Sequence, residues 1–255
     1  MIKLPTTPSF RLEGRRALVT GAGRGIGLAA SAALAQAGAA VTLCARSTAE
    51  IEAGAFAIRE AGGKADTLTL DVSDVTAARD ALASQAPFDI LVNNAGTNRI
   101  RSFTDVTLED YEVVFSLNVK GAFFAAQAVA ARMVEAGKGG SIINMSSQMG
   151  QVGGSNRSLY CASKWAVEGM SKAMALDLAP HGIRVNTICP TFIVTPLTKP
   201  ILADDAFRAH VMSMIKLGRL GQVEDLMGAI VFLASDASAL MTGSALVVDG
   251  GWTAS

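Results

Sequence analysis

This 255-residue chain has no excess of charge of one sign and few cysteines, histidines or aromatic residues. Lys+Arg and Asp+Glu balance at 22 each, so the composition does not favour a nucleic-acid partner or an acidic membrane surface. The cysteines Cys44, Cys161 and Cys189 form no C-x-x-C pair, and His181 and His210 lie far apart. We therefore expect free thiols and no metal site.

The sequence also lacks long apolar runs. The opening segment, MIKLPTTPSFRLEGRR, has no apolar core of the ~7–15 residues typical of a secretory signal. No uninterrupted apolar run reaches the ~20 residues of a membrane-spanning helix. We therefore expect a cytoplasmic protein with no membrane partner. With 50% hydrophobic and 17% charged residues, the chain suits one large compact domain.

Apolar strands alternate with helical segments along the whole chain. Strands are expected at 17–20, 40–45, 64–70, 89–93, 141–145, 183–189 and 245–249, with helices near 27–38, 48–61, 74–85, 107–136, 156–179 and 222–234. Continuous apolar strands separated by helices predict a single α/β domain over 1–255, a doubly wound Rossmann-type fold with a largely parallel seven-stranded sheet covered on both faces. Residues 190–221, with three prolines, interrupt this rhythm and predict a substrate lid.

Two short stretches could carry chemistry. TGAGRGIG, residues 20–27, lies at the first strand-to-helix turn, where glycines and open helix N–H groups suit a phosphate. In SLYCASKWAV, Tyr160 and Lys164 are four residues apart and share a helix face, so the ammonium favours the phenolate form of the tyrosine. Taken alone, such a pair is more often an amphipathic edge with its lysine at the surface.

Together, the motifs resemble those of the short-chain dehydrogenase/reductase family. They are TGAGRGIG, DV at 71–72, NNAG at 93–96, Asn118, SS at 146–147, YCASK at 160–164 and TGSALVVDGG at 242–251. Their order and spacing match the family over nearly the whole chain. The thirteen-residue step to Tyr160 selects Ser147 over Ser146 as the catalytic serine.

The resemblance implies four catalytic residues. Tyr160 is the expected general acid/base, Lys164 lowers its pKa and binds the nicotinamide ribose, Ser147 binds the substrate oxygen, and Asn118 holds a water of a proton relay. Alone, Ser147 would be interpreted as a cap at a strand end and Asn118 as a polar residue on a helix. Because hydride transfer to a carbonyl builds negative charge on oxygen, a hydroxyl and a phenol suit that reaction.

The resemblance also implies a dinucleotide site, whose expected residues are Gly21, Arg24, Gly25, Ile26, Gly27, Arg46, Ser47, Asp71, Val72, Asn94, Ala95, Gly96, Tyr160, Lys164, Pro190, Ile193 and Thr195. The family commonly has Pro-Gly where this chain has Pro190-Thr191, and threonine lacks glycine's backbone freedom. An NAD site usually has an acid at the end of the second strand, whereas this chain has Arg46. With Arg24 as a second cation, we expect NADP(H) rather than NAD, although both arginines could simply be solvated.

Polar residues gather around the expected active-site mouth at Asn98, Arg99, Gln148, Asn156 and Arg157. The residues expected to contact substrate are Ser147, Gln148, Asn98, Arg99, Asn156 and Phe192. Many donors suit a small polyhydroxy or carboxylated carbonyl compound, although loops are polar in any case. NNAGTNR also resembles the corresponding stretch of gluconate 5-dehydrogenase-type members.

Two other functions stay open at this point. A 3-oxoacyl-[acyl-carrier-protein] reductase would need a concentrated basic patch for its acidic carrier, and the sequence has none. A non-catalytic dinucleotide-binding scaffold or sensor would be indicated by loss of Tyr160 or Lys164, and both are present. The family resemblance, together with the apolar segments 107–136 and 156–179, leads us to expect a homotetramer.

Overall fold

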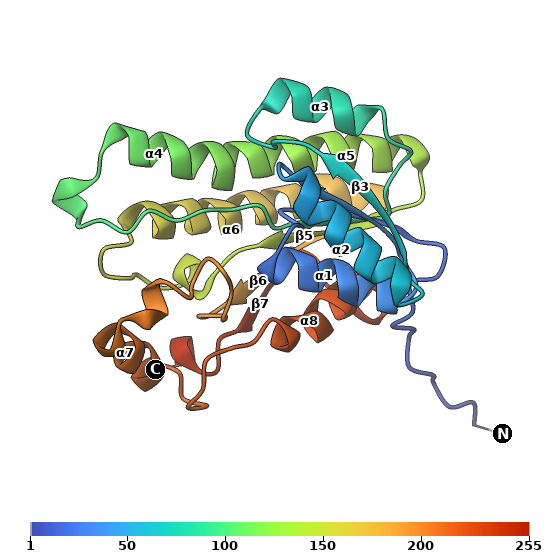
Figure 1. Ribbon diagram of the computed structural model, residues 1–255. Helices are drawn as coiled ribbons and strands as arrows, with labels where there is room; N and C mark the ends of the chain where they lie inside the picture. The colour runs from blue at the N-terminus through green and yellow to red at the C-terminus, as the bar shows by residue number, and fades with distance from the viewer. Residues whose placement is uncertain (1, 255) are drawn as a thin grey trace.

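Seven strands form one all-parallel sheet in the order β3-β2-β1-β4-β5-β6-β7, in a computed structural model that describes residues 2–254 (Figure 1). The strands are β1 (Arg16–Thr20), β2 (Ala40–Ala45), β3 (Lys64–Thr69), β4 (Ile90–Asn93), β5 (Gly140–Met145), β6 (Ile183–Pro190) and β7 (Ala245–Val248). The chain builds outward from β1 to β3, then crosses back to place β4 on the other side of β1. The predicted doubly wound sheet is confirmed, and its crevice opens beyond the carboxyl ends of β1 and β4.

Helices cover both faces of the sheet. They are α1 (Gly25–Gln36), α2 (Thr48–Glu60), α3 (Val75–Ala83), α4 (Leu108–Phe115), α5 (Ala122–Ala136), α6 (Ser158–Leu178), α7 (Asp205–Met214) and α8 (Glu224–Ala234). Single 3₁₀ turns occur at Phe103–Asp105, Gln148–Gly150, Ala179–His181, Ile201–Ala203, Asp236–Ser238 and Trp252–Ala254. α1, α2 and α8 pack on one face, and α3, α5 and α6 on the other.

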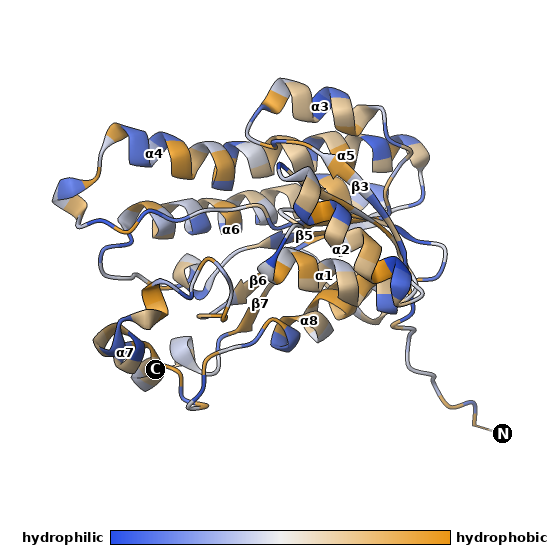
Figure 2. Ribbon diagram, in the orientation of Figure 1, coloured by the Kyte–Doolittle hydropathy of each residue, from blue (hydrophilic) through white to orange (hydrophobic). Residues whose placement is uncertain are grey.

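The sheet separates two hydrophobic clusters. Strand residues such as Val19 and Ile143 pack with α1 and α8, whereas Leu18 and Ile142, their neighbours along the same strands, pack with α3 and α5. Because successive side chains of a strand point to opposite faces, continuous apolar strands supply both clusters at once. Figure 2 shows hydrophobic residues along α1, α8 and the central strands.

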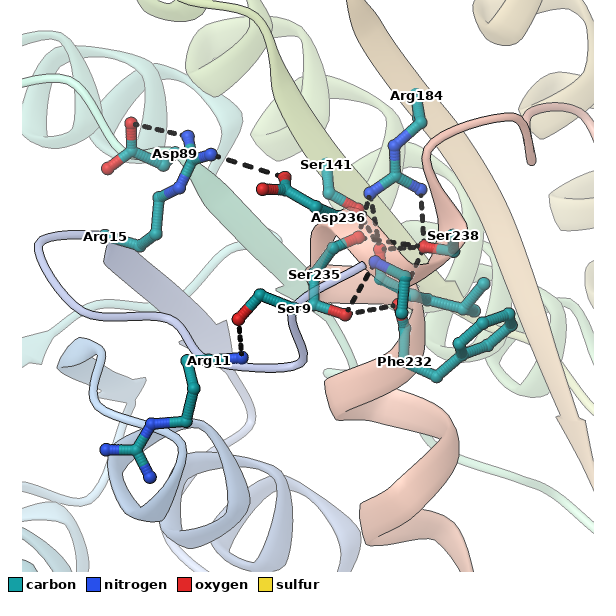
Figure 3. A network of polar contacts seen from close by, with 12 residues as sticks. Ser9, Arg11, Arg15, Asp89, Ser141, Arg184, Phe232, Ser235, Asp236 and Ser238 are labelled. Carbon is teal, nitrogen blue, oxygen red and sulfur yellow. Dashed lines mark hydrogen bonds and ion pairs between the residues drawn. The ribbon is translucent and has the colours of Figure 1, made fainter. Parts of the chain in front are cut away.

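Arg184 ties the amino end of the sheet to the C-terminal end of α8 (Figure 3). From β6, its guanidinium donates to the carbonyls of Leu233 at 2.8 Å and Ser235 at 3.1 Å, and to the Ser238 hydroxyl at 2.9 Å. These carbonyls are the open acceptors of a helix C-terminus, where a cation is favoured. Nearby, Arg15 forms a more exposed pair with Asp236, with 3.5 Å between Nη2 and Oδ1.

The predicted helix at 107–136 is divided. A π-helical turn, η2 (Ser116–Gly121), separates α4 from α5. Within residues 2–254, Leu108–Ala136 is the one helical stretch long and apolar enough, by length and composition alone, to cross a membrane, with a mean hydropathy of 1.4. Its buried alanines and valine pack on α3 and the sheet, so the core accounts for this apolar character.

The segment 190–221 carries α7, a helix that the sequence analysis missed. A small cluster of Phe192, Leu202, Val211 and Ile215 folds the segment onto Met149, beside the carboxyl edge of the sheet. The C-terminal turn lies next to α7 in Figure 1, and Trp252 stacks on Phe192 with ring centroids 5.6 Å apart. The prolines therefore interrupt only the first part of the segment.

We expect Arg184→Leu to destabilise the fold by ~2–4 kcal/mol, because three buried acceptors lose a charged donor. Arg15→Leu is the control, and it should change the unfolding free energy by less than ~1 kcal/mol, since its ion pairs lie at the surface. Urea unfolding followed by circular dichroism measures both. Equal effects of the two substitutions would contradict the role given to Arg184.

Candidate active site

One cavity of about 620 Å³ lies at the carboxyl edge of the sheet. Its wall runs from the glycine-rich turn after β1, past the ends of β2, β4 and β5, to the start of the segment 190–221. This is the topological switch point, where the two halves of a doubly wound sheet leave room for a ligand. Its volume is in the range of cofactor-binding pockets.

The glycine-rich turn leaves room for a phosphate. Gly21 has a φ of 64°, and a Cβ on it would lie 2.8 Å from the Cα of Ala95. A Cβ on Gly27 would lie 2.2 Å from the Gly21 carbonyl oxygen, so position 27, in the first turn of α1, has room only for glycine. α1 has no side-chain cap and no acid in its first turn. Its open N–H groups and dipole suit the pyrophosphate of a dinucleotide, so the residues present fit that group.

Two ion pairs lie at the far end of the cavity. Arg46 follows β2, and its Nη1 lies 3.7 Å from Asp71 Oδ2, whose carboxylate also accepts from Ser73. The Arg24 Nη1 lies 3.2 Å from Glu50 Oε1. Both arginines are exposed, and hydrogen bonds and Arg46 hold the pKa of Asp71 below its ordinary value against the opposing effect of its burial. This end can therefore offer two guanidinium groups to an anion.

The opposite end brings together the predicted serine, tyrosine and lysine. Ser147 follows β5, accepts from the Met149 N–H at 3.1 Å and donates to Gln148 Oε1 at 2.8 Å. Tyr160 lies in the first turn of α6, and Lys164 follows one turn later. The Lys164 ammonium donates to the Met145 carbonyl at 2.8 Å and lies 5.6 Å from the Tyr160 ring centroid. All these groups line the cavity.

Burial governs the proton affinities at this end. Burial raises the pKa of Tyr160, while the Ser147 hydroxyl and the Arg157 guanidinium act to lower it. Burial also lowers the pKa of Lys164 to about 8, against the opposing effects of Cys189 and Glu168. Arg157 and Lys164 thus both bring a positive charge near Tyr160, Arg157 as one of the groups that lower its pKa and Lys164 with its ammonium over the ring. The lowering of the Tyr160 pKa by Lys164 stays a prediction.

Asn118 lies in the π turn between α4 and α5. Its Oδ1 accepts from the Thr97 N–H at 2.8 Å, and its Nδ2 donates to the Thr97 carbonyl at 2.9 Å and to Ser163 at 3.1 Å. A Cβ on Gly96 would lie 3.4 Å from Asn118 Oδ1 and 3.9 Å from the Lys164 ammonium. The Asn118 side chain thus fixes the loop after NNAG beside Lys164. π turns occur often at functional sites, but no residue pattern in the sequence predicted this one.

Most of the predicted site residues line the cavity. The dinucleotide residues do so except Gly27, which lies beneath the turn; of the predicted substrate residues, Ser147, Gln148, Asn98 and Phe192 do. Arg99 does not, because its Nε faces Asp110 Oδ1 at 3.7 Å with the side chain half exposed. Asn156 is exposed, outside the wall, with a φ of 58°.

Thr191 adds to the wall and was not predicted to do so. Its N–H donates to the Val248 carbonyl at 3.2 Å, and within residues 2–254 Asn156 is the one non-glycine residue with a positive φ. Threonine in place of the usual glycine therefore introduces no left-handed strain here. The Thr191 hydroxyl and Asn98 Oδ1 are buried without a hydrogen-bond partner among the described residues. Cys44, Cys161 and Cys189 are free thiols, as predicted.

Comparison with known proteins adds four findings. A family model described as enoyl-(acyl carrier protein) reductase matches residues 21–253. D-erythrulose reductase from Gallus gallus is 41% identical over 97% of this chain and 99% of its own. A short-chain type dehydrogenase/reductase structure from Mycobacterium marinum superposes with a TM-score of 0.92 at 41% identity, covering 96% of this chain and 98% of that one. A gluconate 5-dehydrogenase structure from Burkholderia cenocepacia J2315 in complex with NADP and tartrate gives 0.93 at 39% identity, with coverage of 96% and 98%.

Proposed function

The chain belongs to the short-chain dehydrogenase/reductase family, and on that premise we propose that it uses NADP(H) to interconvert a ketone and a secondary alcohol of a small polyhydroxy or carboxylated compound. The family makes it an NAD(P)-dependent oxidoreductase. The observation that carries the proposal is the single cavity that joins the glycine-rich turn after β1 to Ser147, Tyr160 and Lys164.

The bound dinucleotide would supply the hydride for reduction, or accept it for oxidation. The chain supplies the rest of the chemistry. Ser147 and Tyr160 donate hydrogen bonds to the substrate oxygen, and Tyr160 gives it the proton that completes the alcohol. Lys164, with a pKa of about 8, can return a proton toward Tyr160 near neutral pH. In the oxidation direction, each transfer reverses.

The wall of the cavity supports a polar substrate. Asn98 Oδ1 and the Thr191 hydroxyl are buried there without partners, and Gln148 is 2% exposed. Buried polar atoms left unpaired would penalise a plain aliphatic ketone, whereas hydroxyl or carboxylate groups can satisfy them. The names of two relatives reported above, D-erythrulose reductase and gluconate 5-dehydrogenase, indicate substrates that are small polyhydroxy or carboxylated compounds. The gluconate 5-dehydrogenase structure also contains tartrate, a small hydroxy acid.

The proposal predicts NADPH consumption with keto-sugars or keto-sugar acids, and faster than with cyclohexanone or an acetoacetyl thioester. Tyr160→Phe should lower the turnover number by at least ~10²-fold, because the ring stays and the proton is lost. Tyr111→Phe is the matched control, since Tyr111 is the other of two tyrosines, and it stacks on Phe115 on the surface helix α4. Spectrophotometry at 340 nm measures both.

Two outcomes contradict this part of the proposal. Near-normal turnover in Tyr160→Phe removes the tyrosine from the chemistry. A wild-type protein that favours cyclohexanone or the thioester removes the ground for a polar substrate.

The choice of NADP(H) rests on the end of β2. The first side chain after the strand is Arg46, and Arg24 approaches from the glycine-rich turn into the same cavity. A 2′-phosphate carries up to two negative charges and accepts a guanidinium fork, whereas NAD offers only hydroxyls there. The acids that pair with these arginines come from α2 and the end of β3, so the position after β2 itself is cationic.

Arg46→Asp should shift the preference from NADP(H) toward NAD(H), because a phosphate partner is lost and a repelling charge is added. The ratio of kcat/KM for NADPH to that for NADH should fall by at least ~10-fold, since a hydrogen bond to a charged group contributes about 1.5–3 kcal/mol. Arg79→Asp, on the surface of α3, is the control and should leave the ratio unchanged. A wild-type enzyme that already prefers NAD would contradict the assignment of Arg46.

We also propose that the protein is a homotetramer. α4, α5 and α6 expose large apolar side chains, among them Leu108 (77%), Tyr111 (41%), Phe123 (41%) and Trp165 (53%). α4 and α6 pack together, so these side chains belong to one region on the α5 side of the sheet (Figure 1). An apolar region of this kind is an expected contact between copies of the chain.

The double substitution Tyr111→Asp with Phe123→Asp should reduce the mass measured by light scattering, because charges would be buried at the contact. Wild type should give four times 26.3 kDa. Phe56→Asp is the control, since Phe56 is 59% exposed on α2 on the opposite face and should not alter the mass. A monomeric wild type at micromolar concentration refutes the tetramer.

A further inference from the structure

Arg157 is a buried cation at the substrate end of the cavity. It is the residue immediately before α6, three positions ahead of Tyr160, and it is 4% exposed. Asn156, with a φ of 58°, turns the chain just before it, a conformation that asparagine adopts more readily than most residues. This turn leaves Asn156 in solvent and Arg157 on the cavity wall.

The Arg157 guanidinium packs on aromatic rings instead of on acids. Its Cζ lies 5.8 Å from the ring centroid of Phe192 and 5.7 Å from that of Phe207. Gly154 packs on the aliphatic part of the side chain, where a Cβ would lie 3.4 Å from Arg157 Cγ. In residues 2–254, the structure records no ion pair and no hydrogen bond from the guanidinium. The two rings hold the group in place but leave its fork of N–H donors open.

The other cations on the cavity wall have partners. Arg24 and Arg46 pair with acids at the far end, and Lys164 donates to a backbone carbonyl. The acids of the wall, Glu50 and Asp71, also lie at that far end. Arg157 therefore gives the substrate end a positive charge that no described residue balances.

An unbalanced buried charge is unfavourable unless something compensates it. Burial lowers the pKa of Arg157, but a guanidinium stays charged at any physiological pH. Cation–π contact offsets part of the lost hydration, and the rest calls for an anion. A planar fork of N–H donors matches a carboxylate in two parallel hydrogen bonds.

Resting on the proposed function, we propose that Arg157 binds a carboxylate of the substrate, so that the enzyme acts on keto-sugar acids in preference to neutral ketoses. Arg157 and Tyr160 line the same end of the cavity, so one small molecule can place its carboxylate at the first residue and its carbonyl at the second. Asn98 lies on a neighbouring loop, since the Arg101 N–H donates to the Asn156 carbonyl at 3.2 Å, and its free Oδ1 can accept from a substrate hydroxyl. Arg99 faces Asp110 outside the cavity wall and does not bind the substrate in this proposal.

The test compares 5-keto-gluconate with L-sorbose, a neutral ketose of the same configuration that has a hydroxymethyl group in place of the carboxylate. Wild type should favour the acid in kcat/KM. Arg157→Met keeps contact with the two rings and removes the charge, and it should lower kcat/KM for the acid at least ~30-fold, mainly through KM. Its kcat/KM for L-sorbose also loses the effect of Arg157 on Tyr160, but it should fall far less than that for the acid, and Arg157→Lys should recover part of the lost preference.

A second measurement separates this proposal from the proposed function. Malonate, a dicarboxylate without a carbonyl, should raise the thermal midpoint of wild type with NADPH but not that of Arg157→Met. If wild type reduces no carbonyl compound, the proposed function fails and the malonate shift still decides the role of Arg157. A preference for L-sorbose in wild type, an equal loss for both substrates in Arg157→Met, or an equal malonate shift in both proteins overturns the carboxylate subsite.

Discussion

The contact between the ends of β1 and β4 is the constraint on which the site depends. The Thr20 hydroxyl accepts from the N–H groups of Asn94 and Ala95 at 3.0 and 3.1 Å, and the Asn94 amide donates to the Thr20 carbonyl at 3.0 Å. These bonds hold the glycine-rich turn against the NNAG loop, with Gly21 too close to Ala95 for any side chain. Because the strand order reverses here, the two loops diverge beyond this contact and leave the cavity open.

Burial of charge shapes the two ends of that cavity differently. At the far end, exposed arginines pair with acids, so those charges are screened and free to rearrange around an anion. At the substrate end, Lys164 on α6 and Arg157 just before α6 are both buried. The two acidic residues that line the cavity, Glu50 and Asp71, lie at the other end. The low-dielectric surroundings strengthen the fields of Lys164 and Arg157 on Tyr160 and on any anion that enters.

The sequence pattern predicted secondary structure correctly where the residues of the segment themselves decide its conformation. The alternation of strands and helices predicted all seven members of the sheet. Most of these strands are continuous apolar runs because they are buried on both faces, whereas the edge strand β3, KADTLT, is partly polar and exposed. The same reasoning failed for α7, because three nearby prolines masked a helix that begins at Asp205 with an Asp204 cap. It also failed at Ser116–Gly121, where the apolar residues on both sides predicted one continuous helix and gave no sign of the extra residue that a π turn contains.

The sequence by itself determined the sheet and the glycine-rich turn, because periodicity and turn residues are properties of the chain. Its resemblance to the family singled out Ser147, Tyr160 and Lys164. Only the tertiary structure decided which cations face the cavity. Arg99 and Arg157 are equally polar in sequence, yet Asp110 holds the first outside while Phe192 and Phe207 seat the second inside. Asp110, Phe192 and Phe207 are distant in sequence from the arginines that they contact, so only folding brings each pair together. The proton affinities of Tyr160 and Lys164 follow from the same burial, which no spacing of residues records.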